Sequence, residues 1–229
     1  LEGWFLSPDG NQTVVTGFFD GTRFKIRFSP DKTGIWQYTL GLIDANGIFT
    51  TSPAEFACGP SLHKGRIHIS PFDSRYLAFT DSSVFLGIGQ CLPWYIERYP
   101  QFWNLMASNQ CNLFAYWLPA WDHSILLSNT INQYNTFSAL QVDALIEKCE
   151  HNDLYIIFTI WNYHWLSEKS LGSWNKNPFR HITPKAKDFF INEKSWQQQE
   201  NYYHYILARW GYSRAIAMWQ PISGLEQTE

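Results

Sequence analysis

The feature that most limits the fold of this chain is a strand, helix, strand pattern that repeats after about Pro71. Four short apolar stretches read as strands, at residues 84–88, 112–118, 154–160 and 215–219. The third is almost entirely apolar, as expected for a strand buried on both faces of a parallel sheet. Parallel neighbours require a crossover, usually a helix. Residues 71–229 are therefore expected to form a parallel sheet covered by helices.

The segments between these strands have the periodicity of amphipathic helices. The first helix is expected to start near Pro100 and to place Phe102, Leu105 and Met106 on one face. A capping box at residues 138–141 begins the second helix, and another at 195–198 begins the third, which Gly211 ends. The apolar positions of the last two helices are Val142, Leu145, Ile146, Cys149, Tyr202, Ile206 and Trp210.

The first 70 residues follow a different period. Phe24, Ile26 and Phe28 alternate with charged residues, as in a half-buried strand, and the stretch at 36–40 repeats this alternation. Turn residues separate the two. The pattern predicts a small antiparallel β-sandwich at residues 1–70. It has few strands for a complete sandwich and opens in mid-strand, so we expect a truncated N-terminus.

Repeating βα units can close into a barrel or lie open in a doubly wound sheet. The turn after the first strand, residues 87–94, lacks the glycine-rich form that opens a nucleotide-binding helix. The strands instead end in large polar or aromatic residues, and in a TIM barrel these ends form the active-site face. The predicted fold is therefore multidomain, with the sandwich followed by strands 1 to 4 of a (β/α)8 TIM barrel at residues 71–229.

Composition excludes several classes of partner. The net charge is -3 and the 17 Lys and Arg are scattered, so we expect no nucleic acid. No apolar run reaches the roughly 18 residues of a membrane span. The four cysteines lack metal-ligand spacing, and we expect no metal and no cofactor. Aromatic residues make up 18% of the chain, with 12 Trp. These rings either fill the core or, near a barrel mouth, stack on sugars.

Residues 17–38, GFFDGTRFKIRFSPDKTGIWQY, resemble the Ig-like module called domain of unknown function 5060. That module typically precedes a TIM-barrel glycoside hydrolase of clan A, which includes cellulases and mannanases. Three further segments are similar to the barrel part: WLPAW from Trp117, WNKNPF from Trp174 and RWGYSRAIAMW from Arg209. The resemblance implies retaining hydrolysis of a glycosidic bond in a polysaccharide or oligosaccharide by two carboxyl groups about 5 Å apart.

In clan A relatives the acid/base is the Glu of an Asn-Glu pair after strand 4, and the nucleophile follows strand 7. The resemblance places Trp219, Gln220 and Ser223 on the family's Trp, first Glu and Asn, and Gly224 on the catalytic Glu. Glycine cannot donate a proton. Three explanations stay open: loss of the acid, a register shift that gives the role to Glu226, or a sequence or engineering change at 224. Glu226 can equally be an ordinary solvated carboxylate.

Sugar-facing candidates lie at the ends of the other three strands. At strand 3, Trp161, His164 and Trp165 can cover sugar faces or bond hydroxyls, together with Asn162. The candidates at strands 1 and 2 are Gln90, Trp94, Trp117, Trp121 and Asp122. For any single Trp, core packing is an equal alternative. Residues 112–117 lack the Arg that many relatives carry at the end of strand 2.

A complete barrel takes about 250 residues, so we expect half of it to be missing and the chain to be catalytically silent. A second hypothesis is a non-catalytic glycan-binding pseudoenzyme that has lost the acid and kept the aromatic cleft. A purely structural or interaction protein leaves the aromatic strand ends unexplained. A polysaccharide substrate would favour a secreted or periplasmic location, on the substrate class alone. The sugar, the linkage and the oligomeric state stay open.

Overall fold

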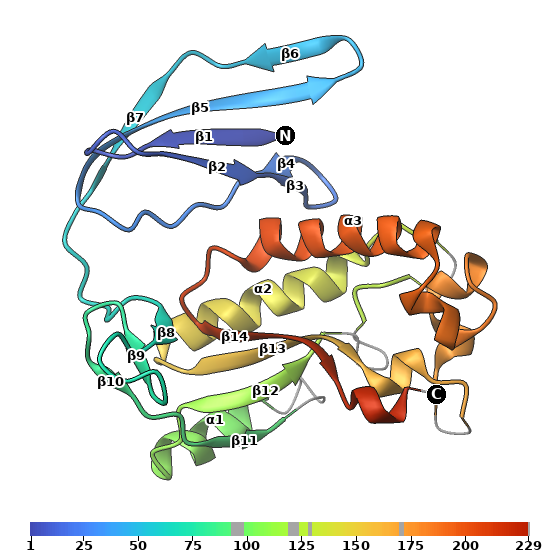
Figure 1. Ribbon diagram of the computed structural model, residues 1–229. Helices are drawn as coiled ribbons and strands as arrows, with labels where there is room; N and C mark the ends of the chain where they lie inside the picture. The colour runs from blue at the N-terminus through green and yellow to red at the C-terminus, as the bar shows by residue number, and fades with distance from the viewer. Residues whose placement is uncertain (93–98, 119–123, 128–129, 170–171, 229) are drawn as a thin grey trace. The chain divides into compact units, whose positions relative to one another are not determined.

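The computed structural model describes residues 1–92, 99–118, 124–127, 130–169 and 172–228 (Figure 1). The chain divides into two compact units. One comprises Leu1–His63 with Asn201–Ser213, and the other Lys64–Glu200 with Arg214–Glu229. No helix in the described part is both long and apolar enough to cross a membrane.

The first unit contains an antiparallel sheet in the order β2-β1-β5-β6, with β7 also paired to β5. Its strands are β1 (Glu2–Leu6), β2 (Gln12–Thr16), β5 (Gly34–Asp44), β6 (Gly47–Thr50) and β7 (Ala54–Cys58). A two-stranded ribbon joins β3 (Phe18–Phe19) to β4 (Phe24–Lys25). The strand predicted at 36–40 is confirmed as part of β5. The one predicted from Phe24 to Phe28 shortens to two residues, and its expected alternation of buried and exposed side chains is not found, since Phe24 is exposed while Lys25 and Arg27 are half-buried.

The core of this unit is aromatic. The Phe28 ring, just beyond the ribbon, stacks on Phe5 of β1 at a centroid distance of 4.0 Å. It also lies 5.1 Å from Trp36 of β5, whose ring stacks with that of Phe56 of β7. Residues near the ribbon thus cover one face of the sheet, and offset or edge-on ring pairs stabilise this packing beyond simple burial.

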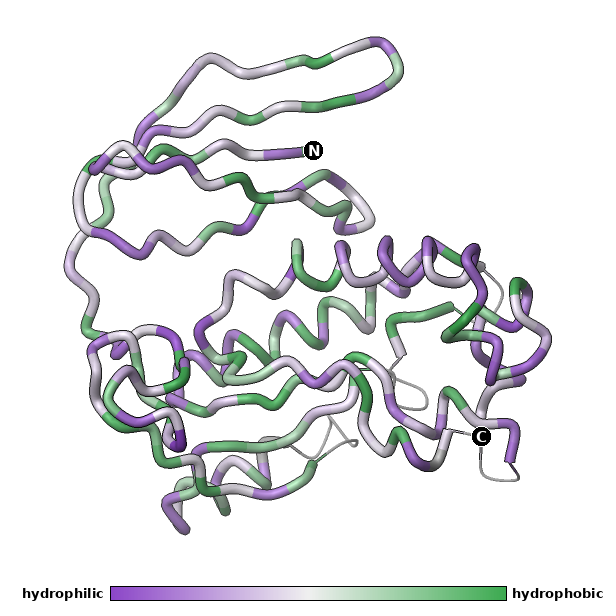
Figure 2. The backbone as a smooth tube through the Cα atoms, viewed as in Figure 1, coloured by the Kyte–Doolittle hydropathy of each residue, from purple (hydrophilic) through white to green (hydrophobic). Residues whose placement is uncertain are grey.

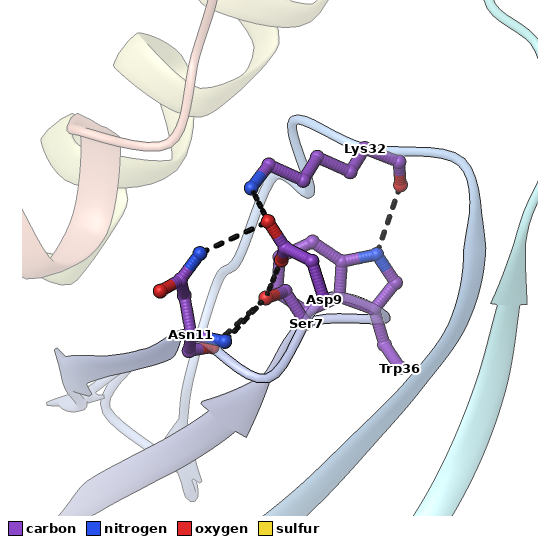
Figure 3. Close-up of polar contacts among 5 residues, drawn as sticks. All are labelled: Ser7, Asp9, Asn11, Lys32 and Trp36. Atoms are coloured by element: carbon purple, nitrogen blue, oxygen red, sulfur yellow. Dashed lines mark hydrogen bonds and ion pairs between the residues drawn. The ribbon is translucent and has the colours of Figure 1, made fainter.

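The turn between β1 and β2 is held by a polar cluster (Figure 3). Asp9 accepts hydrogen bonds from Ser7 Oγ (2.5 Å) and Asn11 Nδ2 (3.0 Å), and forms an ion pair with Lys32. The hydrogen bond from Lys32, with that from Ser7, lowers the pKa of Asp9 to about 2. The Lys32 carbonyl in turn accepts a bond from Trp36 Nε1 (2.9 Å), which links this exposed turn to the aromatic core.

The second unit is built on a parallel sheet in the order β11-β12-β13-β14. The strands are β11 (Gly89–Cys91), β12 (Leu113–Trp117), β13 (Tyr155–Asn162) and β14 (Ile216–Ser223). The helices in the three connections are α1 (Tyr99–Ser108), α2 (Thr136–His151) and α3 (Glu193–Trp210). The predicted order of four strands and three helices is therefore confirmed. Along α2 hydrophobic and hydrophilic residues alternate (Figure 2), and Val142, Leu145, Ile146 and Cys149 are buried.

The first strand of this sheet was predicted in the wrong place. Val84 and Phe85 form β10, which pairs antiparallel with β9 (Leu77–Phe79), and β9 pairs with β8 (Ile67–Ile69). Phe85 packs there with Phe79 and Tyr155. Its apolar side chain is therefore explained by this cluster and not by a place in the parallel sheet. The parallel strand starts four residues after β10, at Gly89, where a Cβ atom would lie 1.5 Å from the Leu113 carbonyl oxygen.

The helix starts were also predicted too late. The N-cap of α2 is Asn135, whose side chain accepts a hydrogen bond from Ser138 N, and Asn192 Oδ1 accepts from Ser195 N at the start of α3. In each case an Asn three residues upstream satisfies the amide of the predicted capping serine. On α1, Met106 is buried as expected whereas Leu105 is exposed. Gly211 follows the last residue of α3, as predicted.

The connections at the carboxyl ends of β13 and β14 contain short 3-10 helices. Four of them follow β13: η3 (Tyr163–Leu166), η4 (Trp174–Lys176), η5 (Pro178–His181) and η6 (Ala186–Phe190). The last, η7 (Leu225–Gln227), follows β14. These segments lie at the edge of the sheet where the sequence predicts the site.

Candidate functional site

Three residues lie in one row at the carboxyl ends of β12, β13 and β14. Two of them, Trp117 and Gln220, were predicted as sugar contacts, and Thr159 lies between them. The register pairs Trp117 with Thr159 and Thr159 with Gln220. Residues paired across parallel strands project to the same face of the sheet, so these three side chains are neighbours. Thr159 Oγ1 donates a hydrogen bond of 2.6 Å to Gln220 Oε1. This bond fixes the amide oxygen and leaves the Gln220 NH₂ group as the donor of that side chain.

Two predicted substrate contacts at the end of β13 are buried instead. The Trp161 side chain is fully buried, and its ring packs edge to face against Phe179 (5.6 Å) and Phe189 (5.1 Å). Asn162 is also fully buried, and its Oδ1 accepts a hydrogen bond from Trp165 N (3.2 Å) that caps η3. A sugar cannot stack on a ring with no exposed surface. In this structure Trp161 is a core residue and Asn162 is a helix cap.

Gly224, which the resemblance aligns with the catalytic Glu, has a backbone conformation that favours glycine. Its φ is +71°, in the left-handed region, where side chains are strained. A Cβ atom there would lie 2.7 Å from Cδ1 of Tyr163. A glutamate at 224 would therefore have to displace either the backbone or this ring. Glu226 lies two residues further on, in η7, with its side chain exposed.

Tyr163 is a site residue that the sequence analysis missed. Its ring also meets the ring of Trp117 edge to face, at 6.1 Å and 85°. Tyr163 thus joins the end of β12 to the loop that follows β14. The available signal was its position directly after the apolar run of β13, the same signal that pointed to Trp161 and His164.

His164 braces the loop after β13. Its Nε2 lies 2.8 Å from Ser173 Oγ, and its carbonyl accepts from Ser173 N at 2.6 Å. Burial, with a smaller effect of nearby Lys176, lowers the pKa of His164 from 6.5. Burial therefore favours the neutral form of the ring. Trp165, next in the chain, is buried in η3 and its carbonyl accepts from Asn177.

The WNKNPF segment is the scaffold of this loop. Asn177 is fully buried, its Nδ2 donates to the Trp165 carbonyl (2.9 Å) and its Oδ1 accepts from Phe179 N (3.0 Å). Trp174 Nε1 donates to the Pro184 carbonyl (3.2 Å). These bonds satisfy backbone groups that a loop would otherwise bury unpaired. The motif thus holds the connection in one shape.

The remaining predicted residues are more dispersed. Gln90 is exposed on β11. Trp219 is half-buried on β14, with its ring 5.2 Å from that of Phe158, and Ser223 pairs with Asn162 at the end of the same strand. Trp94, Trp121 and Asp122 lie outside the described residues.

The described part of this edge does not assemble a carboxylate pair. Within four described residues past each strand end, Glu226 is the only acid. No group of three His, Cys, Asp or Glu among the described residues could hold a metal ion. The described groups can present aromatic faces, an amide donor and one exposed carboxylate.

Comparisons with known proteins agree with this architecture. Residues 1–42 match the family model described as domain of unknown function (DUF5060). A solved "putative glycoside hydrolase" from Bacteroides vulgatus ATCC 8482 is similar, with a TM-score of 0.70 and 13% identity. The match covers 99% of this chain and 45% of that one.

An endo-1,4-beta-mannanase from Rhizomucor miehei gives a TM-score of 0.47 with 16% identity, over 65% of this chain and 46% of that one. A search of curated proteins gave no match. The chain thus spans less than half of the length of either solved relative. At 13% identity the likeness to the Bacteroides structure is one of fold, and the fold of this chain is glycoside hydrolase-like.

Proposed function

We propose that this chain is part of a retaining, two-carboxylate glycoside hydrolase acting on a polysaccharide or oligosaccharide. Residues 1–70 are its Ig-like module, and residues 71–229 form strands 1 to 4 of its TIM barrel. The observation that carries the proposal is the row formed by Trp117, Thr159 and Gln220, at the carboxyl ends of parallel strands in a hydrolase-like fold. An aromatic ring beside an amide donor suits a sugar, which has one apolar face and a rim of hydroxyl groups.

Within this proposal each group at the strand ends has a distinct role. Gln220 donates to a sugar hydroxyl through the NH₂ group that its bond to Thr159 leaves available. Trp117, whose side chain keeps 9% of its surface exposed, meets the half-buried Tyr163 ring edge to face beside it. Trp94, Trp121, Asp122 and Gln90 are further candidates for sugar contacts.

The proposed protein departs from its class at the acid/base. General acid catalysis needs a carboxyl group beside the leaving oxygen, and Gly224 has no side chain to supply one. We propose that these 229 residues bind glycan without cleaving it. The non-catalytic pseudoenzyme is the second candidate, favoured by the left-handed Gly224 packed against Tyr163, because that geometry disfavours a simple return of the acid.

Binding and cleavage are tested separately. Affinity electrophoresis of the 229-residue chain through a panel of polysaccharides measures binding, and release of reducing sugar measures cleavage. We expect retardation by at least one polysaccharide and no release. Steady release by this chain would overturn the claim of inactivity, and free migration through every gel would overturn the assignment to carbohydrate.

A hydrolysis assay on a longer form that contains strands 5 to 8 separates the two candidates. Turnover by that form supports the hydrolase. Retardation without turnover supports the pseudoenzyme.

A further inference from the structure

The loop after β13 lines an open pocket of about 630 Å³ that the proposed function does not use. Six of its lining residues are Glu168, Lys169, Trp174, Asn175, Arg180 and His181. Its volume is in the range of pockets that bind small molecules or single sugar units.

The charge of this pocket is unusual for the chain. Residues 167–188 carry five Lys or Arg against two carboxylates, a net charge of +3, whereas the whole chain has a net charge of -3. Lys169 and Arg180 line the pocket, and neither forms an ion pair with any residue that the structure describes. Concave, like-charged surfaces concentrate ligands of opposite charge.

The single acid in the lining is already engaged. Glu168 Oε1 accepts a hydrogen bond of 2.5 Å from Ala186 N, so this carboxylate helps to hold the loop. It does not pair with Lys169 or Arg180. Two cations therefore remain available to a ligand, with the amide of Asn175 and the ring of His181 beside them.

The walls of the pocket are held in place before any ligand arrives. Trp174 is buried, its Nε1 donates to the Pro184 carbonyl (3.2 Å), and its backbone N donates to the Ser167 carbonyl (3.2 Å). The side chain of Asn177 holds the adjoining turn through its hydrogen bonds to the Trp165 carbonyl and the Phe179 amide. A preformed site loses less conformational entropy on binding than one that orders with its ligand.

We infer that this pocket binds the negatively charged group of an acidic glycan, either the carboxylate of a uronic acid or a sulfate ester. The inference rests on the proposed function and adds the class of sugar. The Arg180 guanidinium matches the two oxygens of either anion with parallel hydrogen bonds, and Lys169 adds a point charge. Asn175 is placed to bond a neighbouring hydroxyl.

The test compares three sets of oligosaccharides of equal length, built from galacturonate, from a sulfated galactose and from uncharged galactose. Calorimetry with the 229-residue chain measures each affinity. A charge-assisted pair lost from the site weakens binding roughly 10-fold or more, so we expect at least that preference for one acidic set over the neutral one. The Lys169→Gln/Arg180→Gln double variant should lose the preference. The matched control, Lys185→Gln/Lys187→Gln, removes two exposed charges of the same loop outside the pocket lining and should change affinity less than about 2-fold.

Arg180→Lys gives a second measurement, since it keeps the charge and loses the planar fork. An intermediate affinity for the acidic set supports recognition by the guanidinium. Equal binding of neutral and acidic sets, or an unchanged preference in the double variant or in Arg180→Lys, overturns the inference and leaves the proposed function standing. Binding of none of the three sets, with retardation by a polysaccharide in the gels, again overturns the inference alone. Failure in both assays overturns the inference and the carbohydrate assignment together.

Discussion

A Cβ atom on Gly224 would lie 2.7 Å from Cδ1 of Tyr163, closer than side-chain carbons approach in folded proteins. Gly224 also has a φ of +71°. The absent acid is thus not an empty space that a glutamate could fill, because both the backbone and the neighbouring ring favour glycine. The absence of an acid at 224 is therefore linked to the packing of the loop after β14 against Tyr163, in the loop after β13.

This relationship predicts that Gly224→Glu alone adds no release of reducing sugar beyond that of the unsubstituted protein, either in the 229-residue chain or in a longer form with strands 5 to 8. We expect Gly224→Ala to lower the free energy of unfolding by about 1–3 kcal/mol. Gly10→Ala is the matched control, since Gly10 has a φ of +85° and nothing within 4 Å of its would-be Cβ. Urea denaturation that follows each unit separately should show a larger loss at 224. Equal losses of unfolding free energy in the two variants would contradict the claim that contact with Tyr163 excludes a side chain at 224.

The Thr159 to Gln220 hydrogen bond should be visible as a coupling energy. Thr159→Val leaves Gln220 Oε1 without its donor, at a cost of about 1–3 kcal/mol in unfolding free energy. Gln220→Met removes the acceptor as well, so the double variant should be more stable than the sum of the single losses predicts. Urea denaturation of the four proteins measures this difference. Additive losses would show that the bond does not stabilise the strand pair.

The loop scaffold depends on Asn177. Asn177→Ala leaves the Trp165 carbonyl and the Phe179 amide without their partners in a buried loop, each at about 1–3 kcal/mol. Asn175→Ala, two residues earlier and exposed, should change stability by less than about 0.5 kcal/mol. Thermal denaturation followed by near-UV circular dichroism compares the two. Similar stability of both variants would contradict the role of the WNKNPF segment as a scaffold.

His164 should make the second unit less stable in acid. Burial lowers the pKa of His164 below 6.5, so the unfolded chain takes up a proton at a higher pH than the folded one. Stability is therefore complete above pH 6.5 and falls as the pH drops from there through the folded-state value. His164→Gln should flatten this part of the profile, measured by urea denaturation at pH 7.5, 6.5 and 5.5. His68→Gln, at an exposed position of the same unit, is the control and should leave it unchanged.

The order of strands and helices in the second unit was predictable, because buried parallel strands are apolar throughout and amphipathic helices repeat every 3.6 residues. Residues 154–160 and the apolar face of α2 show this directly. The residues of the site were harder to predict from the sequence. Apolar residues at a strand end can face either a ligand or the core, and the chain itself does not distinguish them. Trp161 and Trp117 look alike in sequence and both are buried, yet Trp161 has no exposed surface and packs against two Phe rings, whereas Trp117 keeps 9% of its surface exposed.

The sequence by itself determined the two periods of the chain, the parallel strands and the absence of an acid at position 224, since these depend on local pattern and residue identity. Only the tertiary structure decided that Val84 and Phe85 belong to a separate antiparallel sheet, that Asn162 and Asn177 hold loops, and that Tyr163 lies against Gly224. Each of these depends on which side chains from distant parts of the chain meet at the carboxyl ends of the strands. That meeting is set by the register and packing of the whole sheet.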